Sequence, residues 1–216
     1  MSKNTHLQKI ENFLEIEENI EINSKHFEKI MFIYQVAIKE IENKLEILKE
    51  ESKLFYDYDL IDHINTRIKT PESITKKMNE KNLKYTYKEM IKNINDIAGL
   101  RIICPLKKNV FSVRNLIVNL PGIKILKEKD YINNPKKSGY SSYHMIINVP
   151  VALAQSLIYV KVEVQIRTLA MDFWASIEHR MKYKPEKEIS KANSKYLIQC
   201  AKIVEKLDNK MMLLNS

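Results

Sequence analysis

The segment from Tyr159 to Arg167 constrains the fold most, because apolar and polar residues alternate strictly along it. A period of two predicts a β-strand with one dry face and one polar face. A half-buried strand with a merely solvated polar face would show the same pattern. Here, however, the polar side combines one acid with bases and an amide, a mixture that suits a site for phosphates and a metal. The dry face comprises Val160, Val162, Val164 and Ile166, and the polar face comprises Tyr159, Lys161, Glu163, Gln165 and Arg167.

The size of the chain and its cysteines fit a cytoplasmic protein. The 216 residues suffice for one well-buried domain. No uninterrupted apolar run is long enough to cross a bilayer, and the first residues lead into an acidic stretch instead of an apolar signal segment. Cys104 and Cys200 lie far apart without metal-ligand spacing, which predicts buried thiols in a reducing compartment.

The charge of the chain points to polyanionic partners. The formal net charge is +9, a balance that favours nucleotides, RNA or an anionic surface. Lysine supplies nearly all of the positive charge, in a composition also rich in asparagine and isoleucine. The few arginines are therefore the better candidates for gripping phosphate with a planar fork of donors. They are Arg67, Arg101, Arg114, Arg167 and Arg180.

The order of the expected elements predicts one domain of the α/β (α+β) class over residues 24–213, preceded by an N-terminal extension over residues 1–23. A long amphipathic helix begins at Ser24 and runs to about residue 52. Residues 53–66 show no clear period. Helices and strands then mix, which predicts a four- or five-stranded sheet flanked by helices. The further helices are expected at 71–81, 86–94, 107–120, 168–182 and 190–213. A turn leading into a strand is expected over 95–104, and further strands at 123–129, 140–149 and 157–167.

Two clusters in the first half of the domain could bind phosphate or a metal. Arg67 and Lys69 precede a helix that begins at Pro71, and helix N-termini favour anions. An exposed basic helix cap is the alternative. Asp96 precedes Gly99 and Arg101, so an acid and a base could hold a metal and a phosphate together. An aspartate N-cap beside a turn glycine is the alternative there.

Three further clusters lie in the second half. Tyr140 and His144 fall on one face of the expected strand, where a ring can stack on a base while Lys136 meets a phosphate. A lone tyrosine or histidine is more often structural. The polar face of the 157–167 strand forms the next cluster. The last is the helix after it, on which Asp172 shares a face with Ser176 and His179.

Four motifs occur in a fixed order: Arg-x-Lys-x-Pro-Glu-Ser-Ile, Asp-Ile-Ala-Gly-Leu-Arg, Lys-Asp-Tyr-Ile-x-Asn-Pro-Lys-x-x-Gly-Tyr-x-Ser-x-His, and Val-Glu-Val-Gln-Ile-Arg-Thr-x-Ala-Met-Asp-Phe-Trp-Ala-Ser-x-Glu-His. Together they closely resemble the RelA/SpoT synthetase domain, over roughly residues 24–213. More closely still, the chain is similar to the stand-alone small alarmone synthetases of the RelQ type. The resemblance implies a mixed, nucleotidyltransferase-like sheet.

The resemblance also implies an activity and a site. A GTP pyrophosphokinase moves the β,γ-pyrophosphate of ATP to the 3′-hydroxyl of GDP or GTP, which gives ppGpp or pppGpp and AMP. Asp96 and Glu163 match the family's Mg²⁺ carboxylates and are the expected catalytic residues, with Glu163 also as the candidate base. The residues matching the ATP side are Arg67, Lys69, Ser73, Lys77 and Arg101, and those matching the guanosine side are Lys136, Tyr140, His144, Gln165 and Asp172.

One departure from the family and several alternatives stay open. Relatives often carry an arginine where this chain has Ser141, so one cation is missing beside the acceptor phosphates and the preference between GDP and GTP is left open. We expect synthesis without alarmone hydrolysis, a homotetramer, and alarmone or single-stranded RNA as candidate regulators. A basic RNA-binding module derived from a synthetase is the main alternative. A helical interaction protein built on residues 24–52 and 190–213 is another.

Overall fold

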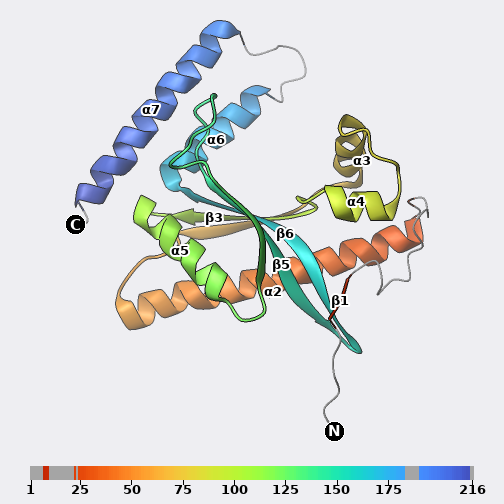
Figure 1. The fold of residues 1–216 in the computed structure, drawn as a ribbon. Helices are drawn as coiled ribbons and strands as arrows, with labels where there is room; N and C mark the ends of the chain where they lie inside the picture. The colour runs from red at the N-terminus through yellow and green to blue at the C-terminus, as the bar shows by residue number, and fades with distance from the viewer. Residues whose placement is uncertain (1–6, 10–21, 23, 183–189, 215–216) are drawn as a thin grey trace.

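The computed structural model describes residues 7–9, 22, 24–182 and 190–214 and places them around one mixed sheet (Figure 1). Five strands follow one another across the sheet in the order β2-β3-β6-β5-β4. β3 and β6 run parallel, and the other neighbours in this order run antiparallel. A sixth, short strand, β1, pairs in parallel with the start of β6. The strands are β1 (Leu7–Lys9), β2 (His63–Ile68), β3 (Ala98–Cys104), β4 (Lys124–Asp130), β5 (Tyr143–Leu153) and β6 (Ser156–Thr168).

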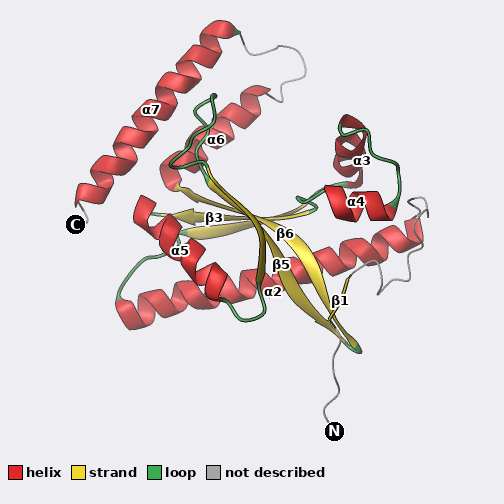
Figure 2. Ribbon diagram, in the orientation of Figure 1, coloured by secondary structure: helices red, strands yellow, loops and turns green. Residues whose placement is uncertain are grey.

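The helices surround the sheet unevenly (Figure 2). The long α2 runs across it and contacts four of its strands, β2, β3, β5 and β6. α3 and α4 lie together at one side, whereas α6 and α7 lie beside each other at the other. The helices are α2 (Ser24–Tyr56), α3 (Pro71–Glu80), α4 (Tyr87–Asn93), α5 (Lys107–Asn119), α6 (Leu169–Lys182) and α7 (Lys191–Leu214).

Burial along β6 follows the alternation of its sequence. The four dry-face residues from Val160 to Ile166 are at most 1% exposed, while Tyr159, Lys161 and Glu163 are only partly buried. α2 contributes the facing apolar stripe, in which Ile30, Ile41 and Leu45 are completely buried. α5 adds side chains to the same core cluster. Burying each such side chain stabilises the fold by about 1.5–3 kcal/mol, so the core holds one face of β6 inward and leaves the polar face available.

Two strands differ from expectation. β2 lies within and just beyond a segment that showed no period, because it is an outer strand whose middle residues are exposed and whose position depends on pairing with β3. β5 begins at Tyr143, not at residue 140, and extends to Leu153. Residues 140–142 therefore belong to the preceding loop, and Tyr140 reaches His144 from that loop.

The predicted extension over residues 1–23 lies outside the described residues, apart from β1 and Ile22. Ile22 is partly buried against the core. The expected sheet of four or five strands is found as the five-strand order, to which β1 is added. Among the helices of the described residues, none combines the length and apolar character needed to cross a membrane.

Candidate active site

Two rows of side chains cross the polar face of the sheet, because residues paired in register on neighbouring strands point to the same side. In the first row, Glu163 on β6 lies between Gly99 on β3 and Ile146 on β5. In the second row, Gln165 lies between Arg101 and His144. The outer strands extend the rows with Arg67 and Lys127 in the first and Asn65 and Lys129 in the second.

Asp96 lies in the turn between α4 and β3, where two lysines from other elements bind it. Lys69, just after β2, and Lys77, on α3, place their Nζ atoms 3.0 and 2.7 Å from Asp96 Oδ2. The other oxygen, Oδ1, is buried and has no hydrogen-bond partner among the described residues. Burial raises the pKa of Asp96, but the hydrogen bonds and charges of the two lysines outweigh it and hold the pKa below its ordinary value. Asp96 is therefore ionised at neutral pH and keeps one acceptor oxygen available.

Glu163 faces the same space under different electrostatic conditions. Burial raises the pKa of Glu163, and the negative charge of Asp96 raises it further. Gln165 Nε2 donates a hydrogen bond of 3.1 Å to Glu163 Oε2, which offsets part of this effect. The Nδ1 atom of His144 lies 3.9 Å from Glu163 Oε1. Two acids that repel each other in a partly buried site form a place where a cation would be stabilised.

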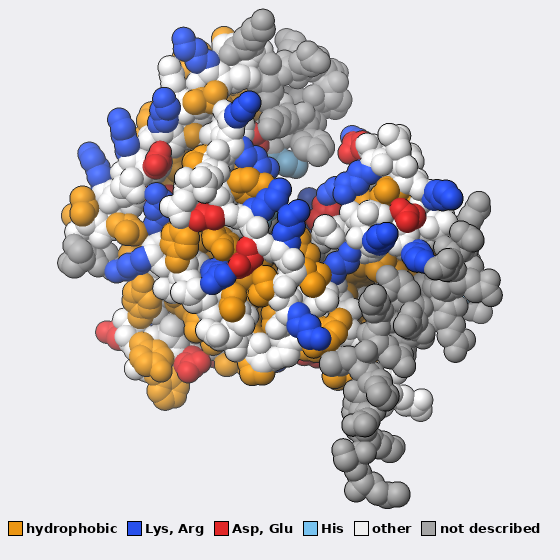
Figure 3. Space-filling model, in the orientation of Figure 1, with side chains coloured by type: hydrophobic (Ala, Val, Ile, Leu, Met, Phe, Trp, Pro, Cys, Tyr) orange, Lys and Arg blue, Asp and Glu red, His pale blue; other side chains and the backbone are white. Residues whose placement is uncertain are grey.

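Two cavities meet at these carboxylates. The first, of about 250 Å³, includes Arg67 and Arg101. The second, of about 270 Å³, includes Lys77 and Lys136. Asp96 and Glu163 line both cavities, and no other described residue does. Figure 3 shows the corresponding hollow, with Lys and Arg side chains gathered around it and acidic side chains deeper inside. Each cavity thus combines basic side chains with the same pair of acids.

Asp96 and Glu163 are the candidate ligands for Mg²⁺. No group of three or more His, Cys, Asp or Glu side chains that could hold a metal occurs within the described ranges. A cage built only from protein side chains is therefore not found there. Mg²⁺, however, commonly binds through one or two carboxylates and takes its other ligands from water and substrate phosphates. Asp96, with its unpartnered Oδ1, and Glu163 fit that arrangement.

Arg167 organises the other end of the polar face. Its side chain is 5% exposed, and its two terminal nitrogens donate in three directions. Nη1 donates to Asp172 Oδ1 at 2.8 Å. Nη2 donates to Tyr140 Oη and to Gln165 Oε1, both at 2.7 Å. Arg101 adds an ion pair to Asp172 at 3.2 Å. One guanidinium thus connects the acceptor loop, defined here as residues 131–142, with β6 and α6.

An aromatic and cationic cluster lies beside Arg167. Tyr140 Oη and His144 Nε2 are hydrogen-bonded at 2.6 Å, and the two rings meet edge to face. Lys136 Nζ lies 4.7 Å from the centre of the Tyr140 ring and 4.8 Å from that of Tyr131. Burial, followed by the charges of Arg167 and nearby lysines, lowers the pKa of His144 to about 3. His144 is consequently neutral at pH 7.

The predicted site residues lie in one connected region with one exception. Ser73 hydrogen-bonds to Thr70 within the first turn of α3 and lines neither cavity. The expected division into two substrate sides does not coincide with the cavities. Lys77 shares a cavity with Lys136, whereas Gln165 shares the other with the arginines. The sequence placed Arg167 on the polar face but assigned no role to it, and its position in the alternation was the available signal.

Residues 66–188, more than half of the chain, match the family described as a region found in RelA / SpoT proteins. The chain therefore belongs to the RelA/SpoT family, which confirms the resemblance carried by the four motifs. Among relatives, GTP pyrophosphokinase YwaC of Bacillus subtilis is 41% identical over 182 residues, which span 84% of this chain and 87% of that protein.

Among solved structures, those of small alarmone synthetases resemble this chain over most of its length. The crystal structure of small alarmone synthetase 1 from Bacillus subtilis bound to its product pppGpp has a TM-score of 0.81 at 31% identity and covers 89% of this chain and 97% of that chain. The structure of the same synthetase bound to AMPCPP has a TM-score of 0.76 at 29% identity, with the same coverage. The expected fold class and the likeness to small alarmone synthetases are both confirmed.

The neutral state of His144 predicts a pH-dependent stability. The unfolded chain takes up a proton on this residue below its ordinary pKa of 6.5, whereas the folded chain does so only near 3. Stability is therefore complete above pH 6.5 and falls as the pH is lowered toward 3, by about 2 kcal/mol at pH 5. Urea unfolding of wild type and of His144→Gln at pH 7 and pH 5 measures this difference. A variant that loses as much stability as the wild type would contradict it.

Proposed function

We infer that this chain is a GTP pyrophosphokinase, which transfers the pyrophosphate of ATP to the 3′-hydroxyl of GDP or GTP and releases AMP. The observation that carries this inference is the sharing of Asp96 and Glu163 by two basic cavities. Each cavity offers cations to one polyphosphate, and the acids lie where the two substrates would meet. The relatives support the same conclusion, since YwaC is a GTP pyrophosphokinase and small alarmone synthetase 1 has structures with pppGpp and with AMPCPP.

Glu163 is suited to the role of general base. Burial and the charge of Asp96 raise its pKa, which makes its carboxylate a stronger proton acceptor than an exposed glutamate. In the proposed reaction Glu163 accepts the proton of the 3′-hydroxyl. The freed oxygen forms a bond to the β-phosphorus of ATP, and the bond from that phosphorus to the oxygen it shares with the α-phosphate breaks. AMP leaves with that oxygen.

Asp96 and Glu163 would hold Mg²⁺ when both nucleotides are present. The bound ion would offset the repulsion between the two polyphosphates and the charge that develops on the transferred group. Lys69 and Lys77 now occupy the same carboxylate of Asp96. Their ammonium groups can also bind a phosphate that approaches Asp96. As the substrate binds, the two lysines would leave the Asp96 carboxylate and bind that phosphate instead.

The two sides of the site follow from the chemistry of their side chains. Arg67 and Arg101 present guanidinium forks to the first cavity, which suits the ATP polyphosphate. Lys77 lines the second cavity, but it and Lys69 both bind Asp96, which lines both cavities, so we place them on the ATP side together with Ser73. Tyr140 offers a ring for the guanine base, and Lys136 lies above that ring, where it can also meet the acceptor phosphates. The residues proposed for the guanosine side are Lys136, Tyr140, His144, Gln165 and Asp172.

The RNA-binding alternative is not supported by the relatives, which are pyrophosphokinases. It also leaves the paired acids without a purpose, because acids repel phosphates unless a cation bridges them. Regulation by alarmone or by single-stranded RNA stays a prediction, and so does a cytoplasmic location. Of the two thiols predicted to be buried, Cys104 is buried, whereas Cys200 is exposed, so that prediction was wrong for Cys200. Alarmone synthesis without hydrolysis is retained as part of the proposal; incubation with ppGpp alone tests it, and release of pyrophosphate would contradict it.

Removing either shared acid should abolish synthesis. Asp96→Asn and Glu163→Gln keep the size of each side chain but remove a charge needed for the metal or the base, so we expect kcat to fall at least about a hundredfold. Production of AMP and ppGpp from ATP, GDP and Mg²⁺ measures this effect. Glu128→Gln is the matched control, since Glu128 lines the second cavity but is already bound by Arg114. Wild-type protein that forms no product at any Mg²⁺ concentration would overturn the proposal.

Arg167→Lys should impair the guanosine side selectively. Lysine keeps the charge but cannot donate to Tyr140, Gln165 and Asp172 from one planar group. We expect the KM for GDP to rise roughly tenfold and the KM for ATP to change less than threefold, as measured by initial rates with each substrate varied in turn. Equal losses for both substrates would indicate a merely structural role for Arg167.

We propose that the chain forms a homo-oligomer through exposed apolar side chains on its outer helices, with the four copies that the family resemblance implies. Leu54, Phe55 and Tyr56 end α2 with exposures of 78%, 78% and 71%, and Leu214 ends α7 at 81%. Clusters of this kind commonly mark protein interfaces. Light scattering should give about four times the chain mass of 25.5 kDa. Replacing Leu54 and Phe55 together by serine should lower that mass, whereas Glu51→Ser should not; a monomeric wild type would refute the assembly.

A further inference from the structure

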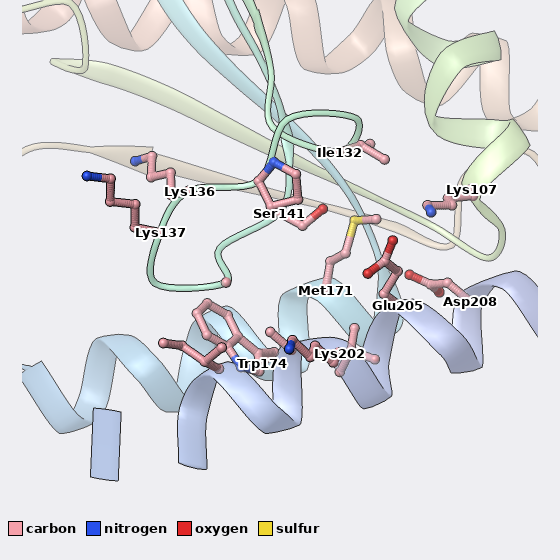
Figure 4. A pocket seen from close by; sticks show the side chains of 15 residues that line it. Lys107, Ile132, Lys136, Lys137, Ser141, Met171, Trp174, Lys202, Glu205 and Asp208 are labelled. Carbon is pink, nitrogen blue, oxygen red and sulfur yellow. The ribbon is translucent and has the colours of Figure 1, made fainter. Parts of the chain in front are cut away.

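A third cavity lies outside the shared-acid site, between the acceptor loop and the two C-terminal helices (Figure 4). Its wall is mainly apolar, from Ile132 and Pro135 on the loop, Met171 and Trp174 on α6, and Val204 on α7. It shares only Lys136 with the cavities that hold the acids. Nothing in the proposed reaction uses this space.

The volume of this cavity is larger than that of an ordinary packing defect. Its volume is about 240 Å³. Protein interiors contain few voids larger than a water molecule, and an apolar cavity of about 150 Å³ already holds benzene. There is accordingly room for a ring-shaped molecule of about ten heavy atoms.

The charges around the cavity are distributed unequally. Figure 4 shows Lys107 at one end, close to Glu205 and Asp208, so the cation there is offset by acids. Lys136 and Lys137 lie together at the other end. In the described part of the chain neither of these two lysines forms an ion pair. A ligand with a negative group at this end and an apolar body between the helices would match both features.

We propose that this cavity binds a small aromatic molecule carrying one acidic group, with its ring between Trp174 and α7 and its acid on Lys136 and Lys137. The ring shields the apolar wall of the cavity from water, and the acid meets two lysines that form no ion pair with any described residue. A cationic head group would be repelled at the same end.

Binding there would act on the acceptor side. Gly139, in the middle of the acceptor loop, has a φ of +91°, and a Cβ built on it would lie 2.5 Å from Ala201 Cβ on α7. The loop is therefore seated directly on α7, next to the cavity. The same loop carries Lys136 and Tyr140, so an acid held by Lys136 competes with the acceptor nucleotide for that ammonium group. This consequence rests on the proposed function, whereas binding itself does not.

Three probes of one size distinguish the head group. They are 4-iodobenzoate, 4-iodobenzyl alcohol and 4-iodobenzylamine, whose iodine quenches tryptophan fluorescence. Trp174 is the only tryptophan in the chain and is 4% exposed, so it reports on this cavity. We expect saturable quenching by the carboxylate, with at least tenfold weaker binding of the amine. Equal quenching by all three probes, or by iodide at the same concentration, would overturn the proposal.

Matched variants locate the probe. Val204→Phe fills the cavity and should abolish saturable quenching, whereas Ile203→Phe, on an α7 residue that is 64% exposed, should leave it unchanged. Lys137→Gln alters only the surface and should weaken binding of the carboxylate roughly three- to tenfold while sparing the alcohol. This variant keeps the test decisive even if Val204→Phe fails to fold. Unchanged carboxylate binding in Lys137→Gln would refute the assigned orientation.

The activity assay supplies a separate readout. With wild-type protein, 4-iodobenzoate should raise the apparent KM for GDP without raising that for ATP. Quenching without this effect would remove the link to the acceptor loop but leave the binding site in place. Absence of both synthesis and inhibition, with quenching intact, would count against the proposed function and not against the cavity.

Discussion

The repulsion between two partly buried carboxylates is the constraint around which the site is built. Asp96 and Glu163 come from a turn and a strand that are far apart in sequence, yet the charge of Asp96 adds to burial in raising the pKa of Glu163. Lys69 and Lys77 offset this repulsion from one side only, since both bind Oδ2 of Asp96. The buried Oδ1 atom keeps an unused lone pair. Glu163, by contrast, forms no ion pair with a lysine or arginine of the described residues, so a cation could still bind at the point where two polyphosphates would meet.

The register of the sheet determines which side chains can reach this point. Because β3 and β6 pair so that Gly99 faces Glu163 and Arg101 faces Gln165, the base of β3 lies beside the amide of β6, and no β3 side chain covers the acid. A slip of one residue would turn every one of these side chains to the opposite face. The dry face opposes such a slip, since a shift of one residue would expose the buried valines of β6. Core packing and the geometry of the site are therefore fixed by the same alternation of residues.

The local sequence pattern was sufficient to predict elements whose own sequence is periodic. It was insufficient for elements whose position depends on pairing with other strands. The alternation in β6 and the apolar stripe of α2 predicted both elements. β2 carries no such period, because it is an outer strand held mainly by β3. The site residues also fall into those that the sequence identified and those whose role depends on the fold. The order of four motifs identified the family and the shared acids as candidates, whereas the three-way role of Arg167 requires that the loop, β6 and α6 be brought together first.

Buried polar atoms without a hydrogen-bond partner lower the stability of the fold, and in this chain most of them lie at the site. Four buried side-chain atoms lack a hydrogen-bond partner in the described part of the chain, and three of them belong to Asp96, Arg101 and Arg167. Each such atom costs on the order of 1–3 kcal/mol, which a core rearrangement or a different side chain could have removed. Their concentration on the polar face means that the cost is borne where nucleotides and a metal would supply the missing partners. Arg167 bears this cost at its Nε atom, while its other nitrogens hold Tyr140, Gln165 and Asp172 in place before any substrate arrives. A site arranged in advance in this way loses less conformational freedom when the acceptor binds.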